Sequence, residues 1–298
     1  MLRIGLFLIT NIAIMVVISL VFSLFGLEGI LAENQVDLNL QALLIMSSII
    51  GFSGSFISLA ISKWMAKRSM RVQLIDERNA GSEIERWLFS TVKKQSQQAG
   101  IGMPEIGIFP SSDPNAFATG ASRNNALIAV SSGLLERMNR NEVEAVLAHE
   151  VSHVANGDMI TMALIQGVVN TFVVFLSRLV GFFVDRVLLK NQRGLGIGYF
   201  ISSIIAQIVF GILASTIVMW FSRRREFYAD AGSAAIVGPR KMIDALRSLQ
   251  NSPDKAELPD QMAAFGISGK KASGFAALFL SHPPLEQRIA ALEKLDQV

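Results

Sequence analysis

The sequence contains no cysteine and only three histidines among its 298 residues. The absence of cysteine excludes a disulfide framework, a thiol nucleophile and a cysteine-bound zinc. Charged residues are also scarce: they make up 17% of the chain, whereas about a quarter of a soluble globular domain is charged. The formal net charge of +3 is too small for a protein that coats nucleic acid, so we expect no nucleic-acid partner.

Hydrophobic residues, in contrast, make up 51% of the chain, and the mean hydropathy is +0.44. This composition excludes a disordered chain, which has low hydrophobicity and high net charge. Four stretches are long enough to cross a bilayer, which takes about 20 apolar residues. They are residues 4–27, 38–62, 159–184 and 194–222. The sequence therefore predicts a multi-pass α-helical membrane protein with four spans and a lipid bilayer as its surroundings.

The charges that follow the spans predict their orientation, because lysine and arginine collect in cytoplasmic loops. Basic clusters follow the second and fourth spans, so we expect both termini and the central segment in the cytoplasm. One loop disagrees, since Arg186, Lys190 and Arg193 lie on the side predicted to be outside. The first span is longer than the roughly 7–15 apolar residues of a secretory signal, so we interpret it as an uncleaved anchor.

The remaining sequence is polar enough to fold in water. We expect residues 63–157 and 223–298 to form one cytoplasmic domain, because only the pair of spans at 158–222 separates them. The other two spans, at 1–62, precede this domain. Within the third span, Arg178 is interpreted as reaching the outer interface, and the alternative is a polar cavity.

Helical spacing of apolar residues predicts helices at 72–98, 240–249 and 285–295. Residues 251–274 are predicted to form a loop. Short apolar segments separated by proline, glycine, serine and asparagine predict the strands of a small sheet, at 105–109, 116–119 and 126–130.

A further helix, with Asn141 as its N-cap and Gly157 at its C-terminal end, carries an H-E-x-x-H motif. His149 and His153 are four residues apart, so both imidazoles project from one face and can bind one tetrahedral zinc. Glu150 is rotated about 100° from His149, which places its carboxylate beside a metal-bound water. Since two of only three histidines fall in this motif, we favour a metal site over the alternative of a chance pair on a solvated helix face.

Two histidines leave a catalytic zinc one protein ligand short, because three ligands and a water are usual. Glu226 and Asp230 follow the fourth span and are again four residues apart, so they share one helix face. Glu226 is expected to bind the metal, and Asp230 to accept a hydrogen bond from a ligating histidine such as His149. His282, the only other histidine, is the alternative third ligand.

These motifs resemble those of the HtpX-type membrane zinc metalloproteases, relatives of the CAAX prenyl proteases. The resemblance covers nearly the whole chain and includes N-A-F-A at 115–118, H-E-V-S-H at 149–153, R-R-R-E-F-Y-A-D-A-G at 223–232 and H-P-P-L at 282–285. It implies that His149, His153 and Glu226 bind one zinc ion per chain and that Glu150 is the catalytic base.

The resemblance also implies an endopeptidase of the bacterial inner membrane. Its substrates would be damaged or misfolded membrane proteins, cleaved at the cytoplasmic face, and other membrane quality-control proteases are expected partners. In such a mechanism Glu150 takes a proton from water and passes it to the leaving amine. His282 and Arg288 are candidate donors to the oxyanion, and for His282 a surface turn residue is an equal alternative. Whether another divalent metal can replace zinc is left open by the sequence.

A short segment between turn-rich residues is a candidate for binding substrate. It would form an exposed strand edge near the zinc and hold an extended substrate through backbone hydrogen bonds, with weak sequence preference. The alternative is an ordinary buried strand. The residues of this segment are Asn115, Ala116, Phe117 and Ala118.

The fold class that we expect is mixed α/β: four membrane helices with a mainly helical, zincin-like cytoplasmic domain carrying a small sheet. A transporter would need polar groups in several spans, and only Arg178 qualifies. A pseudoenzyme would lack Glu150 or a ligand, and none is missing. An intramembrane protease would need its metal helix inside the bilayer, but five charged residues precede His149 within 136–144.

Overall fold

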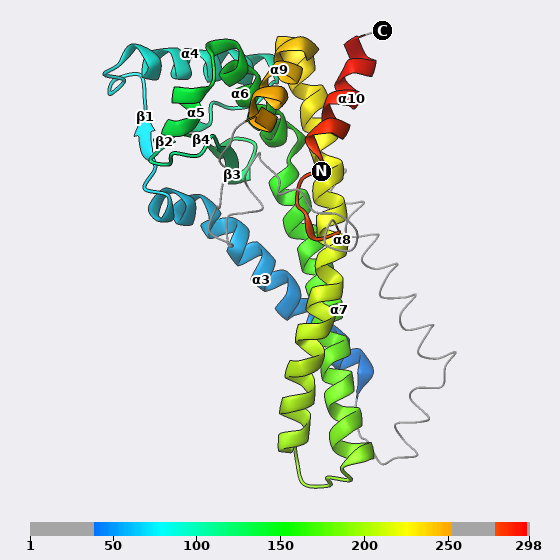
Figure 1. The fold of residues 1–298 in the computed structure, drawn as a ribbon. Helices are drawn as coiled ribbons and strands as arrows, with labels where there is room; N and C mark the ends of the chain where they lie inside the picture. The colour runs from blue at the N-terminus through cyan, green and yellow to red at the C-terminus, as the bar shows by residue number, and fades with distance from the viewer. Residues whose placement is uncertain (1–38, 252–277, 297–298) are drawn as a thin grey trace. The chain divides into compact units, whose positions relative to one another are not determined.

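The protein is described by a computed structural model that covers residues 39–251 and 278–296 (Figure 1). The predicted first span, at 4–27, and the predicted loop at 251–274, apart from its first residue, lie outside the described residues. The described chain is mostly helical and contains one small sheet. In chain order its elements are α3 (Leu40–Ser69), β1 (Gln73–Ile75), α4 (Glu83–Gln98), β2 (Glu105–Phe109), β3 (Ala116–Ser122), β4 (Asn125–Ser131), α5 (Ser132–Arg137), α6 (Arg140–Asn156), α7 (Asp158–Phe182), the π-helix η1 (Phe183–Leu188), α8 (Ile197–Val237), α9 (Pro239–Asn251) and α10 (Leu285–Asp296).

The chain divides into two compact units, and the divisions fall inside long helices. Of the described residues, the first unit comprises 39–57 and 163–218, and the second comprises 58–162, 219–251 and 278–296. Helices α3, α7 and α8 therefore each contribute residues to both units.

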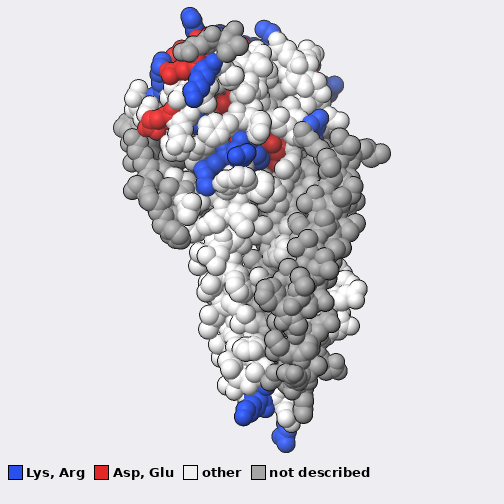
Figure 2. All heavy atoms as spheres, turned by 90° about the vertical axis from the view of Figure 1, so that its right-hand side faces the viewer, with Lys and Arg blue, Asp and Glu red and all other residues white. Residues whose placement is uncertain are grey.

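Three helices are long and apolar enough to cross a membrane: α3, α7 together with η1, and α8. They match the predicted spans at 38–62, 159–184 and 194–222. Large apolar side chains such as Ile49, Ile57 and Ile208 are more than half exposed along α3 and α8, as lipid-facing residues would be. Figure 2 agrees, because long stretches of the surface that it shows carry no charged side chain.

The second unit contains a four-stranded mixed sheet with the order β1-β2-β4-β3. Strands β2 and β4 are parallel, with Ile106 opposite Ile128, and the two outer strands run antiparallel to their neighbours. All three predicted strands are confirmed. Strand β3 extends beyond its predicted end to Ser122, past a register shift that begins at Gly120, and it forms one edge of the sheet.

Side chains of the sheet alternate between two apolar clusters, as the pleat of a strand requires. One face packs in a common core with residues of α4, α6, α9 and α10; its members include Ile106, Ile128, Leu88, Val146, Leu246 and Leu292. On the other face, Phe109, Phe117, Leu127 and Ala129 pack with Ala66 of α3. Helix α6, which carries the H-E-x-x-H motif, packs mainly against α9 and β3.

The predicted helix over 72–98 is wrong over residues 72–82. Residues Gln73–Ile75 form β1, and a turn follows in which the Asp76 carboxylate accepts the N–H groups of Arg78 and Asn79. Helix α4 begins only after Ser82, whose side chain accepts the N–H of Glu85 while the Glu85 carboxylate accepts the N–H of Ser82. This capping box fixes the start of the helix, and local apolar spacing could not override it.

The predicted N-cap of the motif helix is also wrong, by two residues. The cap of α6 is Asn139, whose side-chain oxygen accepts the N–H groups of Asn141 and Glu142 at 2.9 and 3.1 Å. The Glu142 carboxylate accepts the Asn139 N–H in return, which completes a capping box. At the other end, Gly157 is confirmed as the residue that ends α6, with φ 68° and ψ 35° in the left-handed region.

Candidate metal centre and active site

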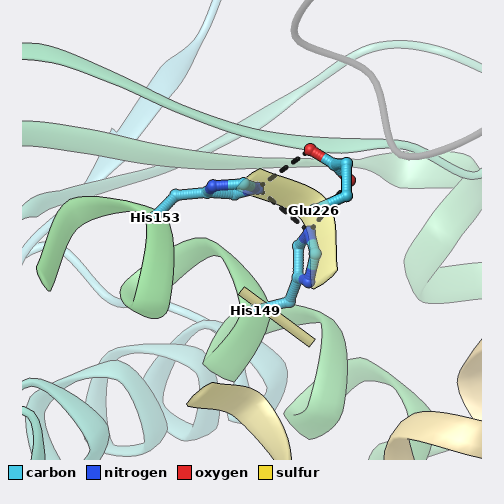
Figure 3. Close-up of side chains that lie close together, drawn as sticks. All are labelled: His149, His153 and Glu226. Atoms are coloured by element: carbon cyan, nitrogen blue, oxygen red, sulfur yellow. Dashed lines mark hydrogen bonds and ion pairs between the residues drawn. The ribbon is translucent and has the colours of Figure 1, made fainter. Parts of the chain in front are cut away.

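Three side chains predicted as metal ligands lie together inside the second unit (Figure 3). The Nε2 atoms of His149 and His153 are 3.1 Å apart. The Glu226 carboxylate lies beside both imidazoles and directs a different oxygen at each, with Oε1 3.4 Å from His153 Nε2 and Oε2 3.5 Å from His149 Nε2. Helix α6 supplies the imidazoles and α8 the carboxylate, which lies four residues beyond the end of the apolar stretch at Ser222.

These side chains lie close enough together to hold one metal ion. Ligand atoms about 2.1 Å from a tetrahedral zinc lie about 3.4 Å from one another. The two imidazole nitrogens are 3.1 Å apart, and one ligand atom from each of the three residues lies within 4.8 Å of the other two. Two imidazole nitrogens and one carboxylate oxygen are also a ligand set that zinc accepts. The residues present therefore fit the metal that the sequence predicted.

Each imidazole has a carboxylate on its other ring nitrogen. Asp230 Oδ1 lies 3.0 Å from His149 Nδ1, so the structure brings the predicted pair together, but without hydrogen-bond alignment. Asp158 Oδ2 lies 2.7 Å from His153 Nδ1, and this residue the sequence reasoning missed. A signal for it exists: a ligating histidine needs an acceptor for its second N–H, and Asp158 directly follows the helix-ending Gly157, where the chain turns back.

The remaining predicted residues, His282 and Arg288, are both buried beside the carboxylates. His282 is 6% exposed, which excludes a surface turn residue, and its Nδ1 lies 2.8 Å from Glu226 Oε2 without hydrogen-bond alignment. Arg288 is 0% exposed, and its Nε and Nη2 donate to the two Asp230 oxygens at 2.7 and 2.6 Å. Its Nη1 lies 3.3 Å from Glu226 Oε2. The guanidinium therefore contacts both acidic residues of α8.

Burial and charge shift the pKa values of this cluster strongly. Burial alone would lower the pKa of His153, but the carboxylates of Asp158 and Glu226 outweigh it and raise that pKa to about 10. The pKa of His149 is raised in the same way, against burial, by Asp230 and Glu226. These shifts mean that the carboxylates favour positive charge between them, which a divalent cation would also supply.

The acidic groups are shifted in opposite directions. Burial raises the pKa of Glu150, which is 3% exposed, and this suits a group that must accept a proton near neutral pH. Burial would also raise the pKa of Glu226, but His282 and the other two imidazoles hold it well below its ordinary value. Against the same effect of burial, Arg288 and His149 lower the pKa of Asp230 to about 2.

The predicted substrate segment combines a position at the edge of the sheet with buried side chains. Strand β3 is an edge strand, and among the described residues no strand pairs with its outer side. Its side chains are nevertheless buried: Asn115, Ala116, Phe117 and Ala118 are all less than 9% exposed. Since α6 packs on β3, this edge strand belongs to the same unit as the metal-ligand cluster.

Comparison with known proteins points to one family. The family described as Peptidase family M48 matches residues 82–296. A protein named Protease HtpX from Thioalkalivibrio sulfidiphilus is 62% identical over 296 residues, covering 99% of this chain and 99% of that protein. Protease HtpX of Pseudoalteromonas atlantica is also 62% identical, over 99% and 100%. The crystal structure of S. mikatae Ste24p shares the fold, with a TM-score of 0.58 and 16% identity over 95% of this chain and 66% of that one.

Proposed function

The chain belongs to peptidase family M48, and from this premise we propose that it is a zinc-dependent endopeptidase of a bacterial inner membrane. Family membership makes it a metalloprotease, and its three apolar helices make it a membrane protein. We assign the metal to His149, His153 and Glu226. The observation that carries this assignment is the convergence of the three residues, whose ligand atoms, one from each, all lie within 4.8 Å of one another.

Zinc held by these residues would activate a water molecule and polarise the scissile carbonyl. Glu150 accepts the proton of the attacking water and later delivers it to the leaving amine; its burial, which raises its pKa, favours both transfers. Asp230 fixes the ring of His149 through Nδ1, and Arg288 fixes Asp230 in turn. Because two donors of Arg288 are bonded to Asp230, we assign the stabilisation of the oxyanion to His282.

Metal analysis joined to proteolysis tests this function. We expect one zinc per chain in the purified protein, cleavage of an unfolded substrate such as casein, loss of cleavage after chelation, and recovery with added zinc. Reconstitution with cobalt or manganese will show whether another divalent ion replaces zinc. A protein that cleaves at full rate after its metal is removed would refute the proposal.

Damaged or misfolded membrane proteins are the proposed substrates, and we propose that they bind by adding a strand to the edge of β3. Two findings support this: the edge position of the strand and the packing of α6 on it. Phe117 is buried, so a proline there would damage folding as well as binding. The test therefore modifies the substrate: peptides N-methylated at alternate residues should be cleaved much more slowly in one register than in the other. Equal rates in both registers would exclude binding by strand addition.

The proposed topology places the active site and both termini in the cytoplasm, with four spans in all. The basic clusters after the second and fourth spans support it. Because the chain has no cysteine, single cysteines can report on sidedness without background. In intact inner-membrane vesicles of native orientation, an impermeant maleimide should label Lys190→Cys and leave Asp244→Cys unlabelled until the membrane is opened. The reverse pattern would invert the topology.

A further inference from the structure

We propose that Asp158 is a positioning residue for the metal site: it fixes the imidazole of His153 as Asp230 fixes that of His149. This inference rests on the proposed zinc function. The Asp158 carboxylate oxygen Oδ2 lies 2.7 Å from His153 Nδ1, and Asp158 is only 7% exposed. A hydrogen bond from Nδ1–H to this oxygen leaves the lone pair on Nε2, the nitrogen that faces His149 and Glu226.

The backbone between the two residues explains why a contact forms over so short a stretch. Gly157 ends α6 in the left-handed region, with its N–H bonded to the carbonyl oxygens of His153 and Val154. The Gly157 carbonyl oxygen then accepts both the N–H and the hydroxyl of Thr161, each at 3.1 Å. This turn returns the chain to the last turn of α6, so Asp158, five residues after His153, faces its ring.

The position of Asp158 also gives it a second role that must be separated from the first. It is the first residue of α7, where an acidic side chain stabilises the helix through its dipole. A residue with that role alone would affect folding and leave the metal untouched. The close contact with His153 distinguishes the two roles, because an acid that serves only the helix start needs no imidazole partner.

Each of the two imidazoles is therefore paired with a carboxylate of its own. Each has Nε2 beside the ligand cluster and Nδ1 beside a buried carboxylate; the His153 contact is an aligned hydrogen bond at 2.7 Å, and the His149 contact, at 3.0 Å, is not aligned. For His149 that carboxylate lies on α8, and for His153 it is the first residue of α7. Since α7 is one of the three helices apolar enough to cross a membrane, the orientation of a metal ligand is tied to the point where that helix begins.

The test is a chelator-competition titration of zinc with the full chain in detergent, for wild type, Asp158→Asn, Asp158→Ser and Glu83→Gln. Glu83 is the matched control, because it is the first residue of α4, is exposed, and pairs with Arg140 and not with an imidazole. We expect both Asp158 variants to bind zinc about 10–100-fold more weakly than wild type, with Glu83→Gln unchanged. In the cobalt-substituted protein, the visible spectrum of the Asp158 variants should also shift, since the field of the His153 ligand changes.

Serine and asparagine both support a helix start, so the metal-free variants should unfold close to the wild-type temperature. If Asp158→Asn does not fold, Asp158→Ser decides, since it removes the carboxylate in a different way. Wild-type zinc affinity in a folded Asp158 variant would overturn the inference and leave only the helix-start role. Failure of the wild type itself to bind stoichiometric zinc would instead refute the proposed function, so the two failures are distinguishable.

Discussion

The candidate metal site is assembled from a local half and a remote half, and the two are stabilised in different ways. The local half comprises His149, Glu150, His153 and Asp158, all within α6 and the first residue of α7. One helix, its capping box and one left-handed glycine fix these side chains relative to one another. Short-range backbone geometry is therefore sufficient to build this half.

The remote half depends on tertiary packing. It joins Glu226 and Asp230 of α8 to His282 and Arg288, which α10 and the residues before it supply. Helix α10 is held against α9 by apolar residues of the common core and by three surface contacts, Arg240 to Asp296, Arg247 to Glu293 and Gln250 to Glu286. Loosening α10 would therefore release Arg288 and affect His149 before His153.

The largest effect is expected from removing Glu226, the one residue of the remote half that we assign as a metal ligand. Glu226→Ala leaves two protein ligands, so metal and peptidase activity should both be largely lost. Zinc content after gel filtration and a chelator titration measure the effect. His282→Ala is the informative partner variant: if Glu226→Ala binds zinc as tightly as wild type while His282→Ala does not, the third ligand is His282.

The next largest effect lies in the local half and separates chemistry from metal binding. Glu150→Gln should keep zinc yet lose about 10²–10⁴-fold in cleavage rate, because a carboxamide cannot accept the proton. Glu144→Gln is the matched control: it lies on the same helix, paired with Lys241 and away from the ligand cluster, and should cleave at the wild-type rate. Near-normal cleavage by Glu150→Gln would show that another group is the base.

The sequence could predict the local half because its signals are local. The spacing of His149, Glu150 and His153 on a helix, and the glycine that ends it, are both present in one short stretch. Even there, Asp158 was missed, since its contact depends on a left-handed turn at Gly157 that no periodic pattern records. The cap of α6 was misplaced for a similar reason: Asn139 and Asn141 are equally good caps in isolation, and the reciprocal bond with Glu142 decides between them.

In the remote half, residue types were predictable and contacts were not. The spacing of Glu226 and Asp230 indicated a shared helix face, and the structure brings both to the histidines. Nothing local indicates that Arg288 binds Asp230 with two donors rather than facing a substrate, because that depends on how α10 packs. The same holds for β1, whose three residues form a strand only because β2 lies beside them.

A smaller effect, on stability rather than catalysis, should follow from removing the charge that holds the remote half together. Arg288→Ala leaves Asp230 and Glu226 buried without their cation, and we expect the metal-free protein to lose about 3–5 kcal/mol of unfolding free energy. Arg288→Lys keeps the charge but cannot form the two-donor contact, so its loss should be smaller.

Chemical denaturation in detergent measures both Arg288 variants. The control is Arg247→Ala on α9, an exposed residue paired with Glu293, for which a loss of under about 1 kcal/mol is expected. Equal small losses for Arg288→Ala and Arg247→Ala would contradict the view that buried charge stabilises the remote half.

The smallest expected effect is a loss of unfolding free energy at low pH, caused by protonation of Asp230 in the remote half. In the folded protein the pKa of Asp230 is held at about 2, below the ordinary 3.8 of an unfolded aspartate, by Arg288 and His149 against the effect of burial. A lowered folded pKa means that the ionised form stabilises the fold above pH 3.8, and that this stability is lost as pH falls through about 2. The difference between the two pKa values corresponds to about 2 kcal/mol of unfolding free energy.

Asp230→Asn cannot titrate, so the gap in unfolding free energy between metal-free wild type and this variant should narrow as pH is lowered from about 4 to about 2. Asp244→Asn, an exposed change on α9, should show no such narrowing. A gap for Asp230→Asn that stays constant across this range would mean that the carboxylate is not held ionised by Arg288, and that the remote half depends on shape and not on charge.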